Sequence, residues 1–558
     1  MSAFGALRLH SALLLGALSA TSCTLALQRE HDQCHTSADC QSRALGAVCT
    51  ENGVCERLLE TQRQPKQTQS CELDADCTDD DWSVCHDGTC QSLAIGSCIR
   101  LGEGGRNGTR ERLPLAVLVP SAELSQPSDA PNLLAASFAI AELQQALVDP
   151  PASSRCDPFP QCDPLPQIVA VACDEDDSAG YAALTDAGVH LLIGPMRAGA
   201  VDNARAAADG HAVLFSPYAD APNLYTPRSS PTSSIVSCKP NRSDSKASLL
   251  SATRFMHDRL VAQSLMAKDG KPLLALSETE RDLGYDQLED GSLEAVVYAD
   301  PPVAGLVSQI QAADAAPGFL VAGSAVEDWS EVIGSLEQSA AFAKRQYPLS
   351  YLLADKQASV LGYFGQAISS DDPPEQRTFG LDSVVSDENR AIHQSFGDAF
   401  WTTTGRPLEP GLDYVRDCVY LATYAAVAGQ LRLSLAAGQL SPVAVLVGLR
   451  ALTGKGRPLR VGPEDIKTVL SELQKNHDFD ASVTLIGGSG DLDLLGVLSV
   501  AEIEAAPTAQ YVRPSARDQQ LYCVDSTLAF YDMDVVFPVS GDAPSLTDSV
   551  SCGPAVGL

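Results

Sequence analysis

Basic residues are scarce in this chain of 558 residues. It has 38 Lys and Arg against 71 Asp and Glu, which gives a formal net charge of −33 at pH 7. Nucleic acids and anionic membrane surfaces are recognised through basic patches. We therefore predict no nucleic-acid partner. The composition, with 45 % hydrophobic and 20 % charged residues, is globular.

The sequence also lacks the motifs of several enzyme classes. It contains no Gly-x-Ser-x-Gly, no His-Glu-x-x-His and no Gly-x-Gly-x-x-Gly. One string, Ser243-Asp244-Ser245-Lys246, fits the S-x-x-K of penicillin-recognising acyl enzymes. Those enzymes also need S-D-N and K-T-G elements, and neither occurs here. We predict that the chain is not an enzyme and binds no cofactor.

Long apolar runs are missing as well, since a membrane-spanning helix needs about 20 apolar residues. The most apolar helix candidate, 414–433, contains Arg416, Asp417 and Arg432, and is interpreted as a core helix. The N-terminal apolar stretch is shorter and ends in Ala20-Thr21-Ser22-Cys23. This pattern resembles a bacterial lipobox, with Ala20 where Leu is preferred. We predict a signal peptide over 1–22 and a lipid-anchored Cys23; an ordinary secretory signal is the alternative.

Cysteine is plentiful, with 17 residues. An even number remains once Cys23 is set aside, as expected for an exported protein that pairs its cysteines. Two copies of one spacing stand out, each ending in Gly-x-Cys: Cys34, Cys40, Cys49, Cys55 and Cys71, Cys77, Cys85, Cys90. Each copy is too short to bury a core, so disulfides must stabilise it. The connectivity stays open.

A metal site in this region is the alternative. Zinc would need Cys-x2-4-Cys pairs, which are missing, and the acidic run around Asp79 lacks the glycine and the closing Glu of a calcium loop. We predict structural disulfides and no metal, with a weak calcium site left as the other possibility. Residues 23–100 are then a stalk, followed by a Gly-rich linker over 101–112.

Short β-runs alternate with helical stretches from Leu113 onward, which indicates parallel βαβ units. The predicted strands and helices of the first part are 114–120, 133–147, 167–172, 179–187, 189–193, 198–208 and 212–215. His190 lies among apolar neighbours and is interpreted as a packed, hydrogen-bonded histidine rather than a ligand. Further strands are predicted at 273–276, 318–322 and 349–353.

Three segments in order carry a family resemblance. They are Gly188-Val189-His190-Leu191-Leu192-Ile193-Gly194-Pro195 with the later Phe215-Ser216-Pro217; Thr404-Gly405-Arg406-Pro407 with Asp413-Tyr414; and Leu485-Ile486-Gly487-Gly488. This succession resembles the type I periplasmic binding proteins, in the branch of leucine/isoleucine/valine-binding proteins and receptor ligand-binding regions. The resemblance covers about 113–505.

The resemblance implies an α/β fold of two parallel-sheet, Rossmann-like lobes that close on a ligand, preceded by the disulfide-rich region. We expect the binding domain over 113–510. Its first lobe would comprise 113–243 and 380–480, its second 246–379 and 481–510, and a C-terminal extension would cover 511–558.

Ligand contacts are expected in the loops after the strands, because helix N-termini and loops at the carboxyl ends of parallel strands bind ligands. These loops include 174–178, 278–285 and 355–357. The candidate contacts are Ser121, Arg197, Ala198, Tyr218, Ala219, Asp220, Glu278, Ser324 and Lys356. In the amino-acid-binding members, hydroxyl side chains in lobe one hold the ligand carboxylate and an acid in lobe two holds its ammonium. Here the corresponding positions resemble Ala198, Asp220 and Lys356. This reversed polarity disfavours a plain α-amino acid. A helix-capping role for Asp220 is the alternative.

Three further disulfides are predicted. Cys156 and Cys162 are separated by five residues in a Pro-rich insertion, Cys173 and Cys238 both lie just past predicted strand ends of lobe one, and Cys523 and Cys552 are both in the C-terminal extension. Cys98 and Cys418 are then left as a pair by elimination.

The predicted function is a lipid-anchored, exported solute-binding protein on a bacterial membrane, facing the periplasm or the cell surface. It would capture a small polar solute for an ABC permease or a signalling receptor. An adhesion or scaffold lipoprotein with a degenerate binding domain is the alternative.

Overall fold

The architecture is described from a computed structural model of the chain. The described residues are 47–49, 55–57, 69–77, 82–102, 111–148, 166–197, 200–208, 210–217, 234–239, 246–266, 268, 271–277, 294–298, 303–312, 319–322, 329–339, 348–354, 360, 364, 374–384, 387–409, 411–435, 439–452, 457–458, 466–474, 479–480, 492–495, 511–514, 518–524, 530–538, 540, 545–546, 551–552 and 556–557.

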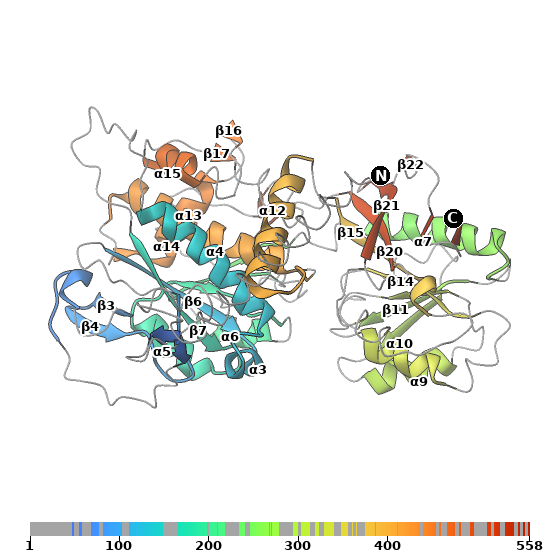
Figure 1. Cartoon of the computed structure of the whole chain (residues 1–558), viewed down its shortest axis with the longest axis horizontal. Helices are drawn as coiled ribbons and strands as arrows, with labels where there is room; N and C mark the ends of the chain where they lie inside the picture. Colours follow the sequence, from blue (N-terminus) through green and yellow to red (C-terminus); the bar gives the residue numbers. More distant parts are fainter. Residues whose placement is uncertain are drawn as a thin grey trace, which may run out of the picture.

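Two eight-stranded sheets form the centres of two lobes (Figure 1). The lobe-one sheet has the order β18-β19-β10-β9-β8-β6-β7-β5, and the strands β10, β9, β8, β6 and β7 run parallel. The strands are β5 Ile99–Leu101, β6 Arg112–Val119, β7 Gln167–Asp174, β8 Leu191–Ile193, β9 Val213–Ser216, β10 Ser234–Ser237, β18 Leu492–Leu495 and β19 Tyr511–Pro514.

Side chains of β6 alternate between two hydrophobic clusters, as strand geometry requires. Leu115 and Val117 pack with helices α4, α13 and α14, whereas Ala116 and Leu118 pack with α5, α6 and the Cys-rich region. The helices of this lobe are α3 Ser121–Ser125, α4 Pro131–Val148, α5 Ser178–Asp186, α6 Val201–Ala207, α12 Asp387–Thr404, α13 Leu412–Leu433, α14 Pro442–Ala451 and α15 Ile466–Gln474. Both faces of the lobe-one sheet are therefore covered.

The lobe-two sheet has the order β12-β11-β13-β14-β15-β20-β21-β22, parallel from β12 to β15 and antiparallel after it. Its strands are β11 Leu273–Ser277, β12 Glu294–Tyr298, β13 Phe319–Ala322, β14 Ser350–Leu353, β15 Thr378–Ser383, β20 Gln519–Val524, β21 Phe530–Phe537 and β22 Ser545–Leu546, and its helices are α7 Lys246–Ala262, α9 Val303–Ala312 and α10 Trp329–Glu337. The predicted α/β fold of two parallel-sheet lobes is confirmed.

The remaining short elements are β1 Ala47–Cys49, β2 Cys55–Arg57, η1 Asp74–Asp76, β3 Ser83–His86, β4 Thr89–Ser92, η6 Pro374–Arg377, β16 Arg457–Pro458, β17 Phe479–Asp480, β23 Ser551–Cys552 and β24 Val556–Gly557. Among the described residues, no helix combines the length and the apolar character that crossing a membrane requires.

The expected lobe boundaries need correction at the C-terminal part. β15 pairs with β14 and β20, so residues 380–383 belong to lobe two. β18 and β19 extend the lobe-one sheet, although 481–510 was expected in lobe two and 511–558 as an extension. β20 to β22 complete the lobe-two sheet. These strands were not predicted from the sequence, and their partners are distant along the chain, so that their pairing is decided by tertiary packing.

Helices α13 and α14 cross in close contact at two glycines. A Cβ atom at Gly429 would meet the carbonyl of Ala444, and one at Gly448 would meet the carbonyl of Ala425. The absence of a side chain at both positions lets the two backbones touch.

An ionic cluster is buried between α13 and α4. The Arg416 side chain is 0 % exposed and lies 3.3 Å from Glu142 Oε2 and 4.0 Å from Asp417 Oδ1. Its guanidinium carbon is 4.4 Å from the ring centroid of Tyr420 and 5.2 Å from that of Phe396. This core helix therefore contains charges that are compensated inside the lobe.

The second Cys-rich repeat is part of lobe one rather than a stalk. We call residues 69–101 the Cys-rich module. Its Trp82, Val84 and Leu93 are buried in one hydrophobic cluster with Val171 and Tyr181 of the lobe. Strand β5, expected in the stalk, pairs antiparallel with β7 and closes that edge of the sheet. The stalk interpretation of 23–100 is thus wrong for the second repeat, because its apolar face is complementary to the lobe.

Asp74 links the Cys-rich module to β6. Its Oδ1 accepts the Cys85 N–H at 2.6 Å, and its Oδ2 accepts the Arg112 N–H at 2.7 Å. The Arg112 guanidinium in turn donates to the carbonyls of Ser83 and Cys77. Both side chains are buried. Burial raises the pKa of Asp74, while the N–H groups of Cys85 and Arg112 oppose that shift.

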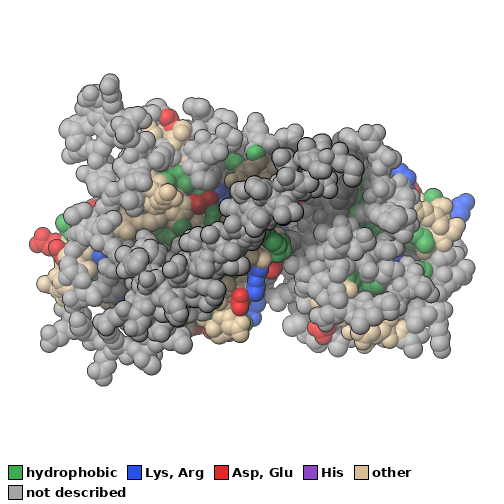
Figure 2. Space-filling view, viewed as in Figure 1, with side chains coloured by type: hydrophobic (Ala, Val, Ile, Leu, Met, Phe, Trp, Pro, Cys, Tyr) green, Lys and Arg blue, Asp and Glu red, His purple; other side chains and the backbone are tan. Residues whose placement is uncertain are grey.

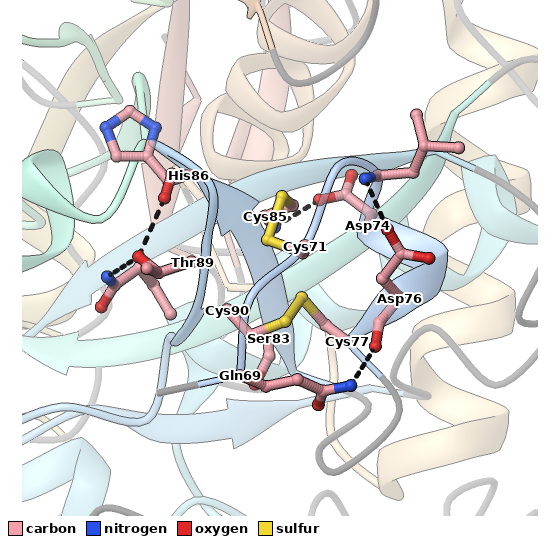
Figure 3. Close-up of a disulfide and its surroundings, with 12 residues drawn as sticks. Gln69, Cys71, Asp74, Asp76, Cys77, Ser83, Cys85, His86, Thr89 and Cys90 are labelled. Atoms are coloured by element: carbon pink, nitrogen blue, oxygen red, sulfur yellow. Dashed lines mark hydrogen bonds between the residues drawn. A yellow bond between two sulfur atoms is a disulfide. The ribbon is translucent and has the colours of Figure 1, made fainter. Parts of the chain in front are cut away.

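Two disulfides in the module run from Cys71 to Cys85 and from Cys77 to Cys90 (Figure 3). The β3–β4 hairpin places Cys85 opposite Cys90, and β1–β2 places Cys49 opposite Cys55. The β3–β4 turn is Asp87-Gly88, with φ values of +48° and +73°, which suits an Asp-Gly hairpin. In the first repeat the third and fourth cysteines also lie opposite each other in an antiparallel strand pair, but five residues connect them instead of four. The two copies therefore share this cysteine placement and differ in the length of the connecting segment.

The predicted pairings of Cys173 and Cys98 are wrong. Cys98 is bonded to Cys173, and Cys238 to Cys418. Cys173 is the next-to-last residue of β7, and Cys238 directly follows β10. Strands β6, β8 and β9 lie between β7 and β10 in the sheet. Strands are spaced about 4.8 Å apart, so the two cysteines are too distant for a bond that needs Cα atoms within about 7 Å.

The other predicted disulfides stay predictions. Cys523 is disulfide-bonded, and Cys552 stays its predicted partner. Cys156 and Cys162 lie outside the described residues.

Candidate functional site

The carboxyl ends of three neighbouring parallel strands define the candidate site. β8, β6 and β7 lie side by side, and their chain continues into the loops at Ser121, 175–178 and 194–197. Ligands of parallel α/β sheets bind at this edge. Ser121 is exposed and begins α3 directly after β6 and Pro120. The structure therefore places Ser121 and Arg197 at one edge of the sheet, and their role as ligand contacts stays a prediction.

Arg197 is anchored by two acids from the loop after β7. Its Nε donates to Glu175 Oε1, and one terminal nitrogen donates to Asp176 Oδ2 at 2.6 Å. The Arg197 side chain remains 43 % exposed, whereas that of Glu175 is fully buried. Two paired carboxylates raise the pKa of Arg197. Its charge is therefore compensated before any ligand arrives.

Glu175 links the loop after β7 to the loop after β8. Its Oε2 accepts the N–H of Met196 at 2.7 Å and that of Arg197 at 3.3 Å. Burial raises the pKa of Glu175, and hydrogen bonds from Arg197 and Met196 oppose the shift. The Tyr181 hydroxyl donates to the Glu175 carbonyl at 3.2 Å, and burial with the neighbouring acids raises the pKa of Tyr181 to about 12. The carboxylate thus joins the ends of β7 and β8.

Further acids make the edge electronegative. Glu123 accepts from Asn132 Nδ2 at 2.6 Å and from the Leu133 N–H at 3.2 Å. Burial raises its pKa most, and repulsion from Glu175 and Glu409 adds to the shift. Burial also raises the pKa of Glu409. Figure 2 shows acidic and basic side chains together at the border between the two halves of the molecule. Several acids therefore lie near Arg197 at this edge of lobe one.

Most predicted contacts fall outside the described residues: Ala198, Tyr218, Ala219, Asp220, Glu278, Ser324 and Lys356. They stay predictions. The loop 174–178 was predicted to lie at the cleft, but Glu175 and Asp176 were not among the individual predicted contacts. The sequence feature that could have identified them is the acidic run Asp174-Glu175-Asp176-Asp177 directly after a buried strand. Arg197 follows the next strand and its Gly-Pro.

His190 lies just before β8 and is only partly buried. Its Nδ1 is 2.5 Å from the His211 carbonyl oxygen. Burial lowers its pKa most, and the bond to His211 opposes this shift. The prediction of a hydrogen-bonded histidine agrees with this geometry, although the residue precedes the strand.

One group of described residues has the spacing of metal ligands: Cys71, Cys77 and Cys90. All three sulfurs are in disulfides. They offer no thiolate to a metal ion, because the thiolate is the ligand form.

No protein-family model and no curated protein matches the chain. It is similar to several solved structures. One is the leucine-, isoleucine-, valine-, threonine- and alanine-binding protein from Brucella ovis in a closed conformation, with 11 % identity, a TM-score of 0.48, and coverage of 80 % of this chain and 98 % of that chain.

Two others are ABC-transporter solute-binding proteins. The Desulfitobacterium hafniense protein in complex with Leu has 11 % identity and a TM-score of 0.43, covering 76 % of this chain and 100 % of that chain. The Rhodopseudomonas palustris BisB5 protein in complex with 3,4-dihydroxybenzoic acid has 11 % identity and a TM-score of 0.44, covering 76 % and 96 %. The chain has the two-lobed α/β fold predicted from its sequence. The three solved structures named above are solute-binding proteins.

Proposed function

We propose that the chain is a lipid-anchored, exported solute-binding protein that closes two lobes on a small polar ligand, for ABC-type transport or sensing. The observation that carries this proposal is the lobe-one edge, where loops after β6, β7 and β8 bring Ser121, Asp176 and Arg197 together. The connections support a hinged pair of lobes. The chain passes from one lobe to the other between β10 and α7, between β15 and α12, and between β19 and β20. A ligand favours the closed state of hinged lobes through contacts that it makes only in that state.

We further propose that the ligand is not a plain zwitterionic amino acid. The resemblance puts Ala198 and Asp220 where a ligand carboxylate would bind. Arg197, the nearby cation, already pairs with Glu175 and Asp176. An incoming carboxylate would have to displace one of these acids or lie beside them unpaired, and burying an unpaired charge costs several kcal/mol. A solute with a cationic or neutral hydrogen-bonding group suits this edge better.

Calorimetry tests the ligand proposal. We expect no binding of leucine or valine by the unmodified chain, and binding of a polar or cationic metabolite found by thermal-shift screening, where a ligand at 100 times its dissociation constant adds about 2.7 kcal/mol of stability. Asp220→Thr should weaken that metabolite at least tenfold. Asp186→Asn, which changes an exposed acid at the C-terminal end of helix α5, is the control. Tight leucine binding, or an unchanged affinity in Asp220→Thr, would contradict the assignment.

Anchoring is tested separately. Cys23→Ala should move the protein from the membrane fraction to the supernatant, because the thioether-linked lipid would be missing and membrane affinity depends on its buried CH2 groups. Fractionation in high salt is the measurement, since salt removes proteins held only by charge. Cys23→Ala protein that still sediments with membranes would rule the anchor out.

A further inference from the structure

A turn of the Cys-rich module lies against the loop that follows β7. The Cys98 N–H donates to the Ile95 carbonyl at 2.9 Å, which closes the turn 95–98. β5 begins directly afterwards and pairs Ile99 with Ala172. Because the two strands are antiparallel, the turn reaches the carboxyl end of β7. This is the end from which the candidate site is built.

Ser97 contacts both sides of that loop. Its Oγ accepts the Asp174 N–H at 3.2 Å, and its own N–H donates to Asp177 Oδ2 at 3.2 Å. Asp177 also caps α5, since its Oδ1 accepts the Gly180 N–H at 2.9 Å. The hydroxyl of Ser97 and this N–H lower the pKa of Asp177. Asp177 is therefore held as a carboxylate between the module and the helix.

The approach is close enough to require glycine at the turn. Gly96 has φ +59°, and a Cβ atom there would lie 3.1 Å from Asp177 Oδ2 and 3.4 Å from Gly180 Cα. The Cys98–Cys173 disulfide adds a covalent link one residue from each side of this contact. Backbone, side-chain and covalent contacts thus meet at one place.

The loop held in this way carries the acids of the candidate site. Asp174 and Asp177 flank Glu175 and Asp176, and these two hold the side chain of Arg197. Glu175 also holds the backbone N–H groups of Met196 and Arg197. A continuous series of contacts therefore runs from Ser97 to Arg197.

We propose that Ser97, with the Cys98–Cys173 bond, is a positioning residue for the ligand-facing edge of lobe one. The Cys-rich module then sets the geometry of Glu175, Asp176 and Arg197 instead of serving only as a spacer. The inference rests on the proposed function for the statement that this edge faces a ligand; the contacts themselves do not depend on it.

Hydrogen exchange of the ligand-free full chain tests the inference. In Ser97→Ala, the amides of Asp174, Met196 and Arg197 should exchange about fivefold faster, the factor that corresponds to the loss of one hydrogen bond. Ser97→Thr keeps the hydroxyl and should restore the slow exchange. Thr89→Ala is the matched control, because it removes a side-chain hydroxyl of the same module that donates to the His86 carbonyl at 3.1 Å and accepts from Gln91 Nε2 at 2.8 Å, away from the loop.

Two outcomes would overturn the positioning role. One is an exchange rate at these three amides in Ser97→Ala that equals the rate in Thr89→Ala. The other is acceleration spread evenly over lobe one, which would indicate a general loss of stability. The paired variant Cys98→Ser/Cys173→Ser should accelerate the same amides by at least tenfold. Since no ligand is present, a failed ligand screen would overturn the proposed function alone and leave this result standing.

Discussion

Arg416→Ala is expected to lower the free energy of unfolding by about 3–5 kcal/mol, because it leaves two carboxylates without their buried cation. Glu142 is 14 % exposed and Asp417 is 0 % exposed, so water cannot replace the guanidinium at Asp417. The stacking on Tyr420 and Phe396 would be lost at the same time. Urea-induced unfolding of the oxidised chain, followed by circular dichroism, measures the change.

Arg406→Ala is the matched control for this variant. Arg406 also pairs with an acid of lobe one, Asp129, at 3.0 Å, but the two side chains are 46 % and 56 % exposed. Exposed pairs contribute about 0–1 kcal/mol. The loss of unfolding free energy in Arg416→Lys should lie between the losses in these two variants, since Lys keeps the charge and loses the planar stacking. Equal losses in Arg416→Ala and Arg406→Ala would show that the buried cluster is not a major source of stability.

Asp74→Ala should detach the Cys-rich module from β6. The change leaves the N–H groups of Cys85 and Arg112 without their acceptor, and each unpaired buried donor costs about 1–3 kcal/mol. The Arg112 guanidinium also loses the nearby negative charge. We expect the unfolding free energy to fall by about 3 kcal/mol, and limited proteolysis to cleave the variant between 102 and 111 faster than the parent chain.

Asp76→Ala separates this effect from ordinary turn capping. Asp76 likewise accepts two N–H groups, those of Glu72 at 2.8 Å and Leu73 at 3.0 Å, but it is exposed and both partners are in its own turn. Loss of such a cap costs about 1 kcal/mol. If Asp76→Ala destabilised the chain as much as Asp74→Ala, the link between Asp74 and β6 would not be what holds the module.

Local patterns were sufficient to predict most of the central strands. The runs predicted at 273–276, 318–322 and 349–353 form β11, β13 and β14, because short apolar runs between polar segments satisfy a strand buried on both faces. The helix predicted at 133–147 is α4, and the segment 414–433 lies in α13. The packing of that core helix also agrees with its interpretation, with Arg416 compensated rather than exposed.

Long-range partners could not be predicted in the same way. Trp82 and Asp74 gave no sign in the sequence that they pack on Tyr181 and β6, because a single buried side chain has no periodicity. The predicted pairings of Cys173 and Cys98 were wrong for a related reason, because spacing along the chain does not reveal the sheet order that separates Cys173 from Cys238. At the site, the loop after β7 was predicted, but the pairing of Glu175 and Asp176 with Arg197 required the fold.

The Cys98–Cys173 bond also determines how a pulling force would pass through the molecule. Under the anchoring proposed above, tension from Cys23 would pass the first repeat, enter the Cys-rich module and reach β7 through a covalent bond in addition to the three-residue pairing of β5 with β7. The same proposal makes lobe one the part that is coupled to the membrane and lobe two the part that moves. A membrane partner of the proposed binding protein would then sense the movement of lobe two against a fixed lobe one.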